Sequence, residues 1–193
     1  NLQTWEFFWV RDPEKKKKLV KYCFSQPAAK TAQELVVAVA RPDRWNEIND
    51  LMLAKFDEKK KIRLKAAYQY YSSIVPKAYN MGPFGIYGPF KQLYVWYKGL
   101  TKPMPRGPFS LSGMRLWAQK STALACQNFM LAIRAHGFDS CPMEGMDAKR
   151  VKALLNLSKG ASICMVISVG KRSETGVYGP RVRFDQDLFI KEI

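Results

Sequence analysis

The feature that most constrains the fold is a helical pattern over residues 112–136 whose middle carries no charge. Residues 121–133 are apolar on nearly every face, which is typical of a helix buried at the centre of a domain. Gly137 follows where a left-handed C-terminal cap belongs. The chain is 47% hydrophobic and 13% aromatic, so it can bury a sizeable core around such a helix, and global disorder is excluded.

The other predicted elements alternate between strands and helices. The predicted strands are residues 5–10, 34–40 and 163–169, and the last two are so apolar that both of their faces should be covered. The other predicted helices are residues 13–24 with Asp12 as N-cap, 43–74 with Asp43 as N-cap and Pro76 at the end, 90–98, and 147–155. This alternation indicates an α/β or α+β layered domain, and a length of 193 residues suits a single domain over residues 1–193. No uncharged stretch reaches about 20 residues without Pro or Gly, and the start has no signal-peptide pattern, so neither a membrane helix nor a targeting segment is expected.

The chain has 32 Lys and Arg against 16 Asp and Glu, which gives a formal charge of +16. Such an excess has three interpretations: nucleic-acid binding, attachment to an anionic membrane surface, or binding of a phosphorylated cofactor with the remaining charge solvated. The lysine runs at residues 15–18 and 59–61 lie in helical patterns without interleaved aromatic side chains, so we interpret them as solvated helix faces. A basic nucleic-acid-binding module is the most distant alternative.

The inventory of reactive side chains excludes two kinds of site. A catalytic triad or a His-rich metal site would have to be built around His136, the single histidine. The cysteines at positions 23, 126, 141 and 164 have no CxxC spacing, so no metal site is expected. Free thiols with apolar neighbours suit a reducing compartment, which predicts a cytoplasmic protein.

Residues 79–108 combine many Gly and Pro residues with aromatic side chains. Phe84, Tyr87 and Phe90 fall outside a regular amphipathic pattern, which favours a lid-like insertion or a pocket wall. A small satellite core beneath a long loop is an equal alternative.

Residues 137–147 connect two predicted helices through a segment that could bind a ligand with its backbone. Pro142 has no N–H, whereas Glu144 and Gly145 offer theirs, and Gly145 has no side chain to block a planar ligand. Ordinary turn chemistry between two helices is the alternative interpretation.

A second group of candidate binding residues lies near the C-terminus, in residues 170–172 and 179–183. Arg181 and Arg183 alternate along an extended segment, so both point to one side and suit a phosphate group. Solvated charge is the alternative. The chain has neither a Walker phosphate-binding loop nor a glycine-rich dinucleotide fingerprint after a strand.

Taken in order, these residues resemble the FMN-dependent nitroreductase family. Residues 1–5, Asn-Leu-Gln-Thr-Trp, are similar to the family's Asn-x-Gln-Pro-Trp segment, with Thr4 in place of the usual Pro. Ser25 and Gln26 stand where the family places a flavin-contacting polar pair.

The resemblance continues in the C-terminal half. Residues 137–147 match the motif Gly-x-Asp-x-x-Pro-x-Glu-Gly-Phe-Asp, with Met146 in place of Phe. Residues 180–183 match the family's Pro-Lys-x-Arg segment after the closing strand. The match extends over nearly the whole chain and is weakest over residues 41–111.

The resemblance implies an α+β fold: a central mixed or antiparallel sheet surrounded by helices, with the long helix at a homodimer interface and FMN between the protomers. It implies that Pro142 lines the flavin face and that the Glu144 and Gly145 N–H groups address flavin N5, where a donor stabilises the reduced ring. The cofactor-binding residues that it implies are Asn1, Gln3, Ser25, Gln26, Pro142, Met143, Glu144, Gly145, Arg181 and Arg183, with the two arginines on the FMN phosphate.

The reaction implied by the resemblance has two steps. NAD(P)H gives a hydride to FMN, and a nitroaromatic, quinone or related acceptor is then reduced in the same place, so no catalytic side chain or metal is required. Phe84, Tyr87 and Phe90 would stack on the substrate. The expected partners are this small-molecule acceptor and a second copy of the chain, with neither nucleic acid nor membrane. A non-catalytic flavin-binding relative is the alternative.

One family feature has no counterpart in this sequence. Family members usually begin with a helix whose Arg-x-Ser-x-Arg/Lys motif holds the phosphate and the flavin ring. The sequence starts at Asn1, after that segment, so we expect either a fragment or a chain whose leading part was removed or is not included.

Overall fold

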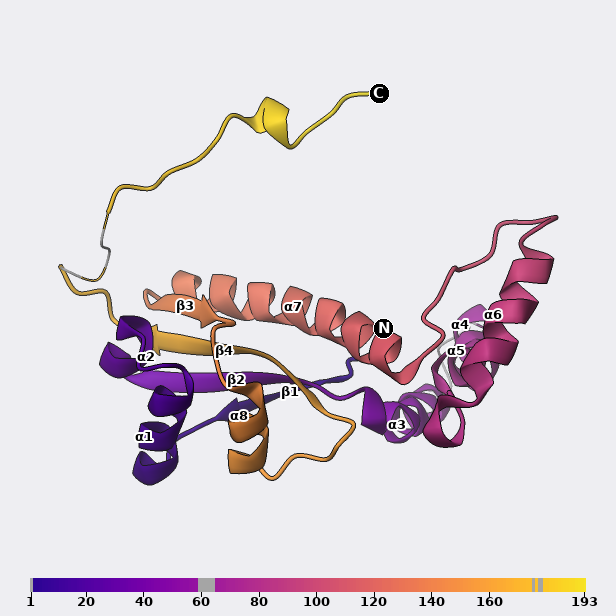
Figure 1. The fold of residues 1–193 in the computed structure, drawn as a ribbon, viewed down its shortest axis with the longest axis horizontal. Coiled ribbons are helices and arrows are strands. Elements are labelled where there is room, and N and C mark those ends of the chain that lie inside the picture. Colours follow the sequence, from indigo (N-terminus) through magenta and orange to yellow (C-terminus); the bar gives the residue numbers. More distant parts are fainter. Residues whose placement is uncertain (1, 59–64, 175, 177–178) are drawn as a thin grey trace.

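A computed structural model describes residues 2–58, 65–174, 176 and 179–193. Its centre is a four-stranded antiparallel sheet with the strand order β1-β2-β4-β3 (Figure 1). The strands are β1 (Trp5–Trp9), β2 (Glu34–Ala40), β3 (Asp139–Met143) and β4 (Ser162–Gly170). The predicted α+β class and the three predicted strands are therefore confirmed, whereas Asn1 and the lysines at 59–61 lie outside the described residues.

The two central strands are the two that the sequence marks as apolar throughout. All residues of β2 from Leu35 to Ala40 are buried, and so are those of β4 from Met165 to Val169. Helices cover both faces of this pair, which is why the two strands need apolar side chains on both sides.

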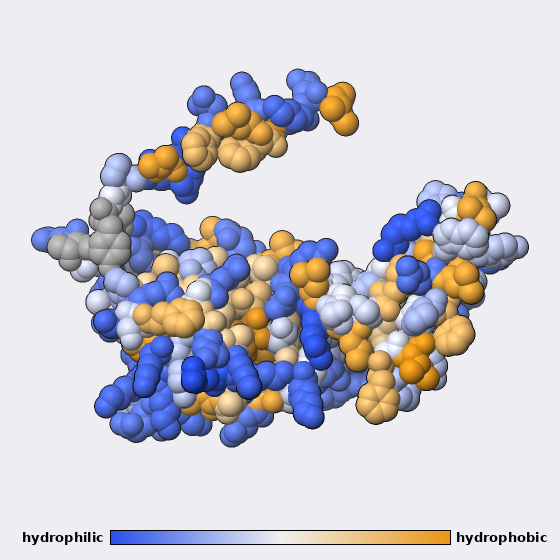
Figure 2. All heavy atoms as spheres, in the orientation of Figure 1, coloured by the Kyte–Doolittle hydropathy of each residue, from blue (hydrophilic) through white to orange (hydrophobic). Residues whose placement is uncertain are grey.

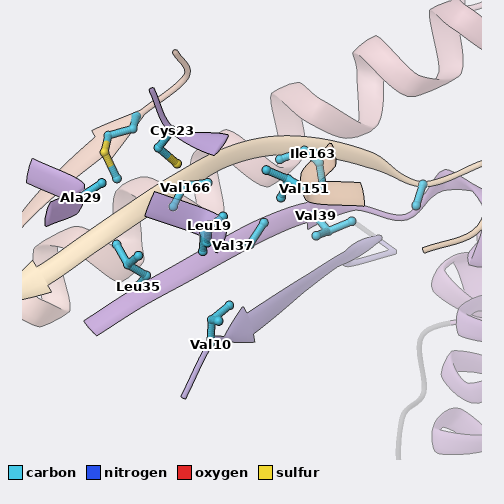
Figure 3. Close-up of a cluster of buried hydrophobic side chains, with 12 residues drawn as sticks. Val10, Leu19, Cys23, Ala29, Leu35, Val37, Val39, Val151, Ile163 and Val166 are labelled. Atoms are coloured by element: carbon cyan, nitrogen blue, oxygen red, sulfur yellow. The ribbon is translucent and has the colours of Figure 1, made fainter. Parts of the chain in front are cut away.

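One face of the sheet is covered by α1 (Pro13–Tyr22) and α8 (Ala148–Leu154). Leu19 and Val151 from these helices pack with Val37 and Val166 of the sheet in the larger hydrophobic core (Figure 3). Asp12 caps α1 as predicted, because its Oδ1 accepts a hydrogen bond from the Lys15 N–H at 2.7 Å. The lysine run at residues 15–18 lies mostly on the exposed side of α1, as expected for a solvated face.

The opposite face is covered by α7 (Leu111–Ala135). Its buried residues, Met114, Ala118, Thr122 and Cys126, are four positions apart and form one stripe against the sheet. The prediction that this helix is buried on nearly every side is wrong for the single chain. A single sheet covers only one side of a helix, and the leucines of the outer side remain exposed.

A β-bulge in β4 alters which side chains face α7. Ala38 of β2 pairs with Met165, but the next residue, Val39, pairs with Ile163, so Cys164 is an extra residue in β4. Ile163 faces α1 and α8, whereas Cys164 and Met165 both pack on the α7 side. All four cysteines are free thiols, and Cys126 of α7 is fully buried in this second core.

The chain between β2 and α7 forms an arm that projects from the sheet (Figure 1). Its described elements are η1 (Pro42–Arg44), α3 (Trp45–Glu58), α4 (Lys65–Gln69), the π-helical turn η2 (Tyr70–Ile74), α5 (Val75–Tyr79), η3 (Pro83–Gly85) and α6 (Tyr87–Lys98). The prediction that Pro76 ends the helix is wrong. Pro76 lies inside a continuous helical stretch, residues 65–79, directly after the π-helical turn η2, an irregular turn of the kind at which a helix accommodates a residue that cannot donate the regular hydrogen bond.

Aromatic side chains attach the arm to α7. The Tyr79 ring lies 4.9 Å from that of Trp117 and 6.0 Å from that of Trp45, centroid to centroid. A small cluster of partly buried aromatic rings therefore lies at the base of the arm. It does not contain Phe84 or Phe90, whose side chains are exposed.

Charged side chains join the arm to the edge of the sheet. Glu6 of β1 forms ion pairs with Arg41 and Arg44, and Arg41 also binds the Asp43 carboxylate through Nε at 3.1 Å and Nη2 at 3.0 Å. Ser158 donates a third hydrogen bond to Asp43. Asp43 is thus not the N-cap that the sequence predicts, because its carboxylate is directed to these two partners.

Candidate functional site

Strand β3 forms one edge of the sheet and carries the motif residues. Pro142 pairs with Ile167 and Met143 with Val166, so this segment is a strand and not the simple connection that the sequence predicts. An edge strand tolerates a proline because its second side needs no N–H donor. Its residues are mostly polar or small, and apolar and polar positions do not alternate along it, so the sequence did not predict a strand here.

The four predicted residues of this segment divide into two groups. The Met143 side chain is buried among the residues of the larger core, which leaves only its backbone for a ligand. Pro142, Glu144 and Gly145 are exposed. Within the described part of the chain, the N–H groups of Glu144 and Gly145 have no hydrogen-bond acceptor, so both donors are available to a ligand.

Gln26 holds this segment in place from a distant part of the sequence. Its Nε2 donates to the Gly145 carbonyl at 2.7 Å and to the Cys23 carbonyl at 3.1 Å. The Asp147 N–H donates to the Tyr22 carbonyl at 2.8 Å, which is a second link to the end of α1. The structure thus brings together Gln26 and Gly145, two residues that the family resemblance assigns to one cofactor site.

The turn before Gln26 explains how its side chain reaches Gly145. Phe24 and Ser25 have φ values of +54° and +53°, and this left-handed pair reverses the chain between α1 and α2 (Pro27–Thr31), a helix that the sequence analysis missed. A Cβ on Gly145 would lie 3.3 Å from Gln26 Nε2, so a larger residue there would displace the amide. Asp147 caps α8, and the Arg150 backbone N–H on its carboxylate holds the Asp147 pKa below its ordinary value.

A cavity of about 560 Å³ lies beside β3, next to Cys141. Arg134 from the last turn of α7, together with Lys171 and Arg172 after β4, lines the cavity. The Asp139 carboxylate lies between Arg172 and Arg134, the latter at 2.7 Å, and the Arg172 hydrogen bond keeps the Asp139 pKa low. Three cations face one ionised carboxylate, so the cavity has a net positive charge that suits an anion. The sequence did not lead us to predict Arg134 as an anion-binding residue. Its position in the last helical turn before Gly137 could have indicated that it lies beside residues 137–147.

Other predicted site residues lie far from β3 in the single chain. Arg181 and Arg183 are exposed in the C-terminal tail, which runs away from the sheet (Figure 1), and Arg183 Nη1 donates to the neighbouring Val182 carbonyl at 2.7 Å. Gln3 precedes β1, at the opposite edge of the sheet from β3. One chain therefore does not bring these residues to Gly145, and their roles remain predictions.

The predicted substrate residues lie on the arm. Phe84 in η3, and Tyr87 and Phe90 in the first turns of α6, are exposed to 98%, 44% and 72%. Figure 1 shows α6 at the other end of the molecule from β3. In the described part of the chain, no three His, Cys, Asp or Glu side chains come together as a metal site would require.

A comparison with family models decides the family. The model described as the nitroreductase family matches residues 1–171 of the chain. The chain belongs to the nitroreductase family. The resemblance drawn from residues 137–147 and the other motifs is therefore confirmed.

One similar protein is distant from this chain in sequence. Protein DrgA of Synechocystis sp. is 26% identical over 174 residues, a match that covers 90% of this chain and 66% of DrgA. The chain thus spans less than two thirds of the length of that relative.

Solved structures of similar proteins have the same fold. A Staphylococcus epidermidis protein described as an NAD(P)H:FMN oxidoreductase superposes with a TM-score of 0.72 at 18% identity, covering 100% of this chain and 76% of that one. An Exiguobacterium sibiricum protein described as a nitroreductase, crystallised in complex with FMN, gives a TM-score of 0.70 at 18% identity, with coverages of 100% and 78%. At these identities the likeness establishes the fold.

Proposed function

We propose that the protein is an FMN-dependent oxidoreductase that uses NAD(P)H to reduce small organic acceptors such as nitroaromatics or quinones. The observation that carries this proposal is the Gln26–Gly145 hydrogen bond, which holds two unpaired backbone donors beside an exposed proline at a sheet edge. A planar ring with acceptor atoms along one edge fits such a surface, because the proline ring gives it an apolar contact and Gly145 adds no side chain. FMN is a ligand of this kind, and it is bound in one of the similar structures.

The residues of this chain fit both ends of FMN. Pro142 and the N–H groups of Glu144 and Gly145 would hold the flavin ring, and Lys171, Arg172 and Arg134 in the adjacent cavity would attract the phosphate. Arg181 and Arg183 would join them if the tail folded back over the cavity. When bound, FMN supplies hydride transfer between NAD(P)H and the acceptor, while the protein positions the reactants and limits the access of water.

A homodimer would unite the residues that lie apart in one chain. Leu116, Leu124 and Leu131 on the outer side of α7 are exposed to 60%, 70% and 58%, an apolar stripe of the kind that a second copy covers. Gln3 and the arm residues of one protomer would then complete the site at β3 of the other. In this arrangement Phe84, Tyr87 and Phe90 would stack on an aromatic acceptor.

Absorption spectroscopy of the purified protein tests the proposal. We expect a flavin spectrum, either on isolation or after addition of FMN, and bleaching of the visible band by NADH or NADPH without oxygen. Binding without bleaching by either nucleotide would indicate a non-catalytic flavin-binding relative, and a protein that stays colourless with excess FMN would refute the proposal.

The phosphate assignment is tested with a separate set of variants. Arg172→Ala removes a cation of the cavity, and the double variant Arg181→Ala/Arg183→Ala removes the predicted clamp in the tail. We expect each change to weaken FMN binding and to leave riboflavin binding nearly unchanged, since riboflavin has no phosphate. An equal loss for both ligands would contradict a phosphate-binding role.

A further inference from the structure

Residues 59–138, which run from the middle of the arm through α7, carry charge of one sign. No Asp or Glu occurs between Glu58 and Asp139, whereas Lys and Arg recur along the whole stretch. All of the acidic residues therefore lie outside this stretch, and most of the excess positive charge of the protein belongs to it. Such a region attracts an anionic partner over a distance of about one Debye length.

The end of the arm, residues 96–106, combines this charge with exposed apolar side chains; we call it the tip. Trp96, Tyr97 and Leu100 are exposed to 58%, 61% and 65%. Figure 2 shows hydrophobic and basic residues side by side on this projecting part of the surface. So many large apolar groups exposed together indicate that something covers them.

Basic side chains surround these apolar groups. Lys98 Nζ lies 5.7 Å from the centroid of the Tyr97 ring, and Lys102 is exposed. Arg106 Nη2 donates to the Gly99 carbonyl at 3.5 Å, which folds the returning chain against the end of α6. The tip is thus a folded structure with a mixed apolar and cationic surface.

This composition matches one class of partner in particular. Trp and Tyr side chains favour the boundary between lipid headgroups and acyl chains, and Lys and Arg bind anionic headgroups beside them. Leu100 and the chain around Met104 add aliphatic surface, which acyl chains cover but a nucleic acid does not. We propose that the tip binds the surface of a bilayer that contains anionic lipids.

The binding proposed here is peripheral. Within the described residues, no helix combines the length and apolarity needed to cross a membrane. The tip lies beyond the arm residues assigned to the acceptor site, so membrane attachment and catalysis use different parts of the arm. The proposal is independent of the flavin chemistry, and it replaces the expectation that the protein has no membrane partner.

Flotation with liposomes tests the proposal. The intact protein is mixed with vesicles of phosphatidylcholine alone or of phosphatidylcholine with about one third phosphatidylglycerol, at low and at high salt. We expect binding to the anionic vesicles that weakens in high salt and little binding to neutral vesicles. Equal binding to both vesicle types, or none to either, would overturn the proposal.

Two pairs of variants separate the tip from general charge effects. Lys98→Gln with Lys102→Gln should reduce the partition coefficient roughly thirty-fold, at about tenfold per 1.4 kcal/mol and about 1 kcal/mol per lysine near the surface. Lys17→Gln with Lys18→Gln on α1 makes the same change of net charge far from the tip and should have little effect. An equal loss of vesicle binding in the two double variants would contradict a specific role of the tip.

The apolar part of the tip needs a test of its own. Trp96→Ser with Leu100→Ser should weaken vesicle binding about tenfold or more, whereas Leu51→Ser, at an exposed position on α3, should not. Sedimentation analysis of the same variants excludes another occupant. A change from dimer to monomer without any loss of vesicle binding would show that a second copy covers the tip, and it would refute the proposal.

Discussion

The Gln26 side chain offers the sharpest test of how the site is built. Substitution by Glu keeps the size and shape of the side chain but removes both N–H donors. In Gln26→Glu, a carboxylate would face the carbonyls of Cys23 and Gly145, which now accept hydrogen bonds at 3.1 and 2.7 Å. Repulsion among the three oxygens should release the loop from the end of α1.

The size of the effect follows from the contacts that are lost. Each hydrogen bond contributes a net of roughly 0.5–1.5 kcal/mol, so the pair holds the loop with about 1–3 kcal/mol. If the loop must be held in this position to bind flavin, the FMN dissociation constant should rise about 5- to 150-fold in Gln26→Ala, at tenfold per 1.4 kcal/mol. The increase in the FMN dissociation constant for Gln26→Glu should lie at or above the upper end of this range because of the added charge.

The assay is a titration of flavin fluorescence with protein, repeated for each variant at a temperature well below its unfolding transition. Gln92→Ala, at an exposed position on α6, is the matched control and should bind FMN like the unchanged protein. Gln26→Glu with unchanged FMN affinity would refute the reasoning, because the loop would then not need this link.

Three further predictions concern stability and reactivity. Leu19→Ala deletes a side chain with 0% exposure and should lower the free energy of unfolding by about 3–5 kcal/mol in urea denaturation; a loss below about 1 kcal/mol would contradict its place in the core. Cys141 is exposed, whereas burial raises the pKa of Cys23 to about 11, so a thiol reagent at pH 8 should modify Cys141 before Cys23, as peptide mapping can show. Burial opposes ionisation of Asp43, but the Arg41 and Ser158 hydrogen bonds outweigh it and lower the pKa below 3.8, so this group stabilises the fold above pH 3.8 and ceases to do so as the pH falls through its lowered value. In Asp43→Asn, the free energy of unfolding should therefore fall less as the pH is lowered. An acid-unfolding profile identical to that of the unchanged protein would contradict a stabilising role of the Asp43 carboxylate.

Local patterns in the sequence predicted the centre of the fold. The apolar runs of β2 and β4 and the cap at Asp12 depend on neighbouring residues, and the structure has them where they were expected. Strand β3 was missed because nothing in its own sequence alternates, and its identity as a strand comes from pairing with β4. The same is true of Arg134, which reaches the cavity only through the packing of α7 on the sheet.

The burial of α7 shows a different limit of prediction from the sequence. Its sequence indicates that nearly every side should be covered, but the sequence does not state by which molecule. One side packs on its own sheet, and the exposed leucines remain for the proposed second protomer. The positions of Arg181 and Phe84 relative to Gly145 were beyond reach for the same reason, since spacing along a chain does not give distances between its ends or between chains.

The extra residue in β4 makes this strand unusually tolerant of a change in length. Ile163 and Met165 face opposite sides of the sheet, as two adjacent residues of a regular strand would. Deletion of Cys164 would therefore straighten the strand and keep each remaining side chain on its present side, whereas deletion of a residue in the regular part of the strand would turn one half over. A homologue one residue shorter at this point could share the same core without a compensating change elsewhere.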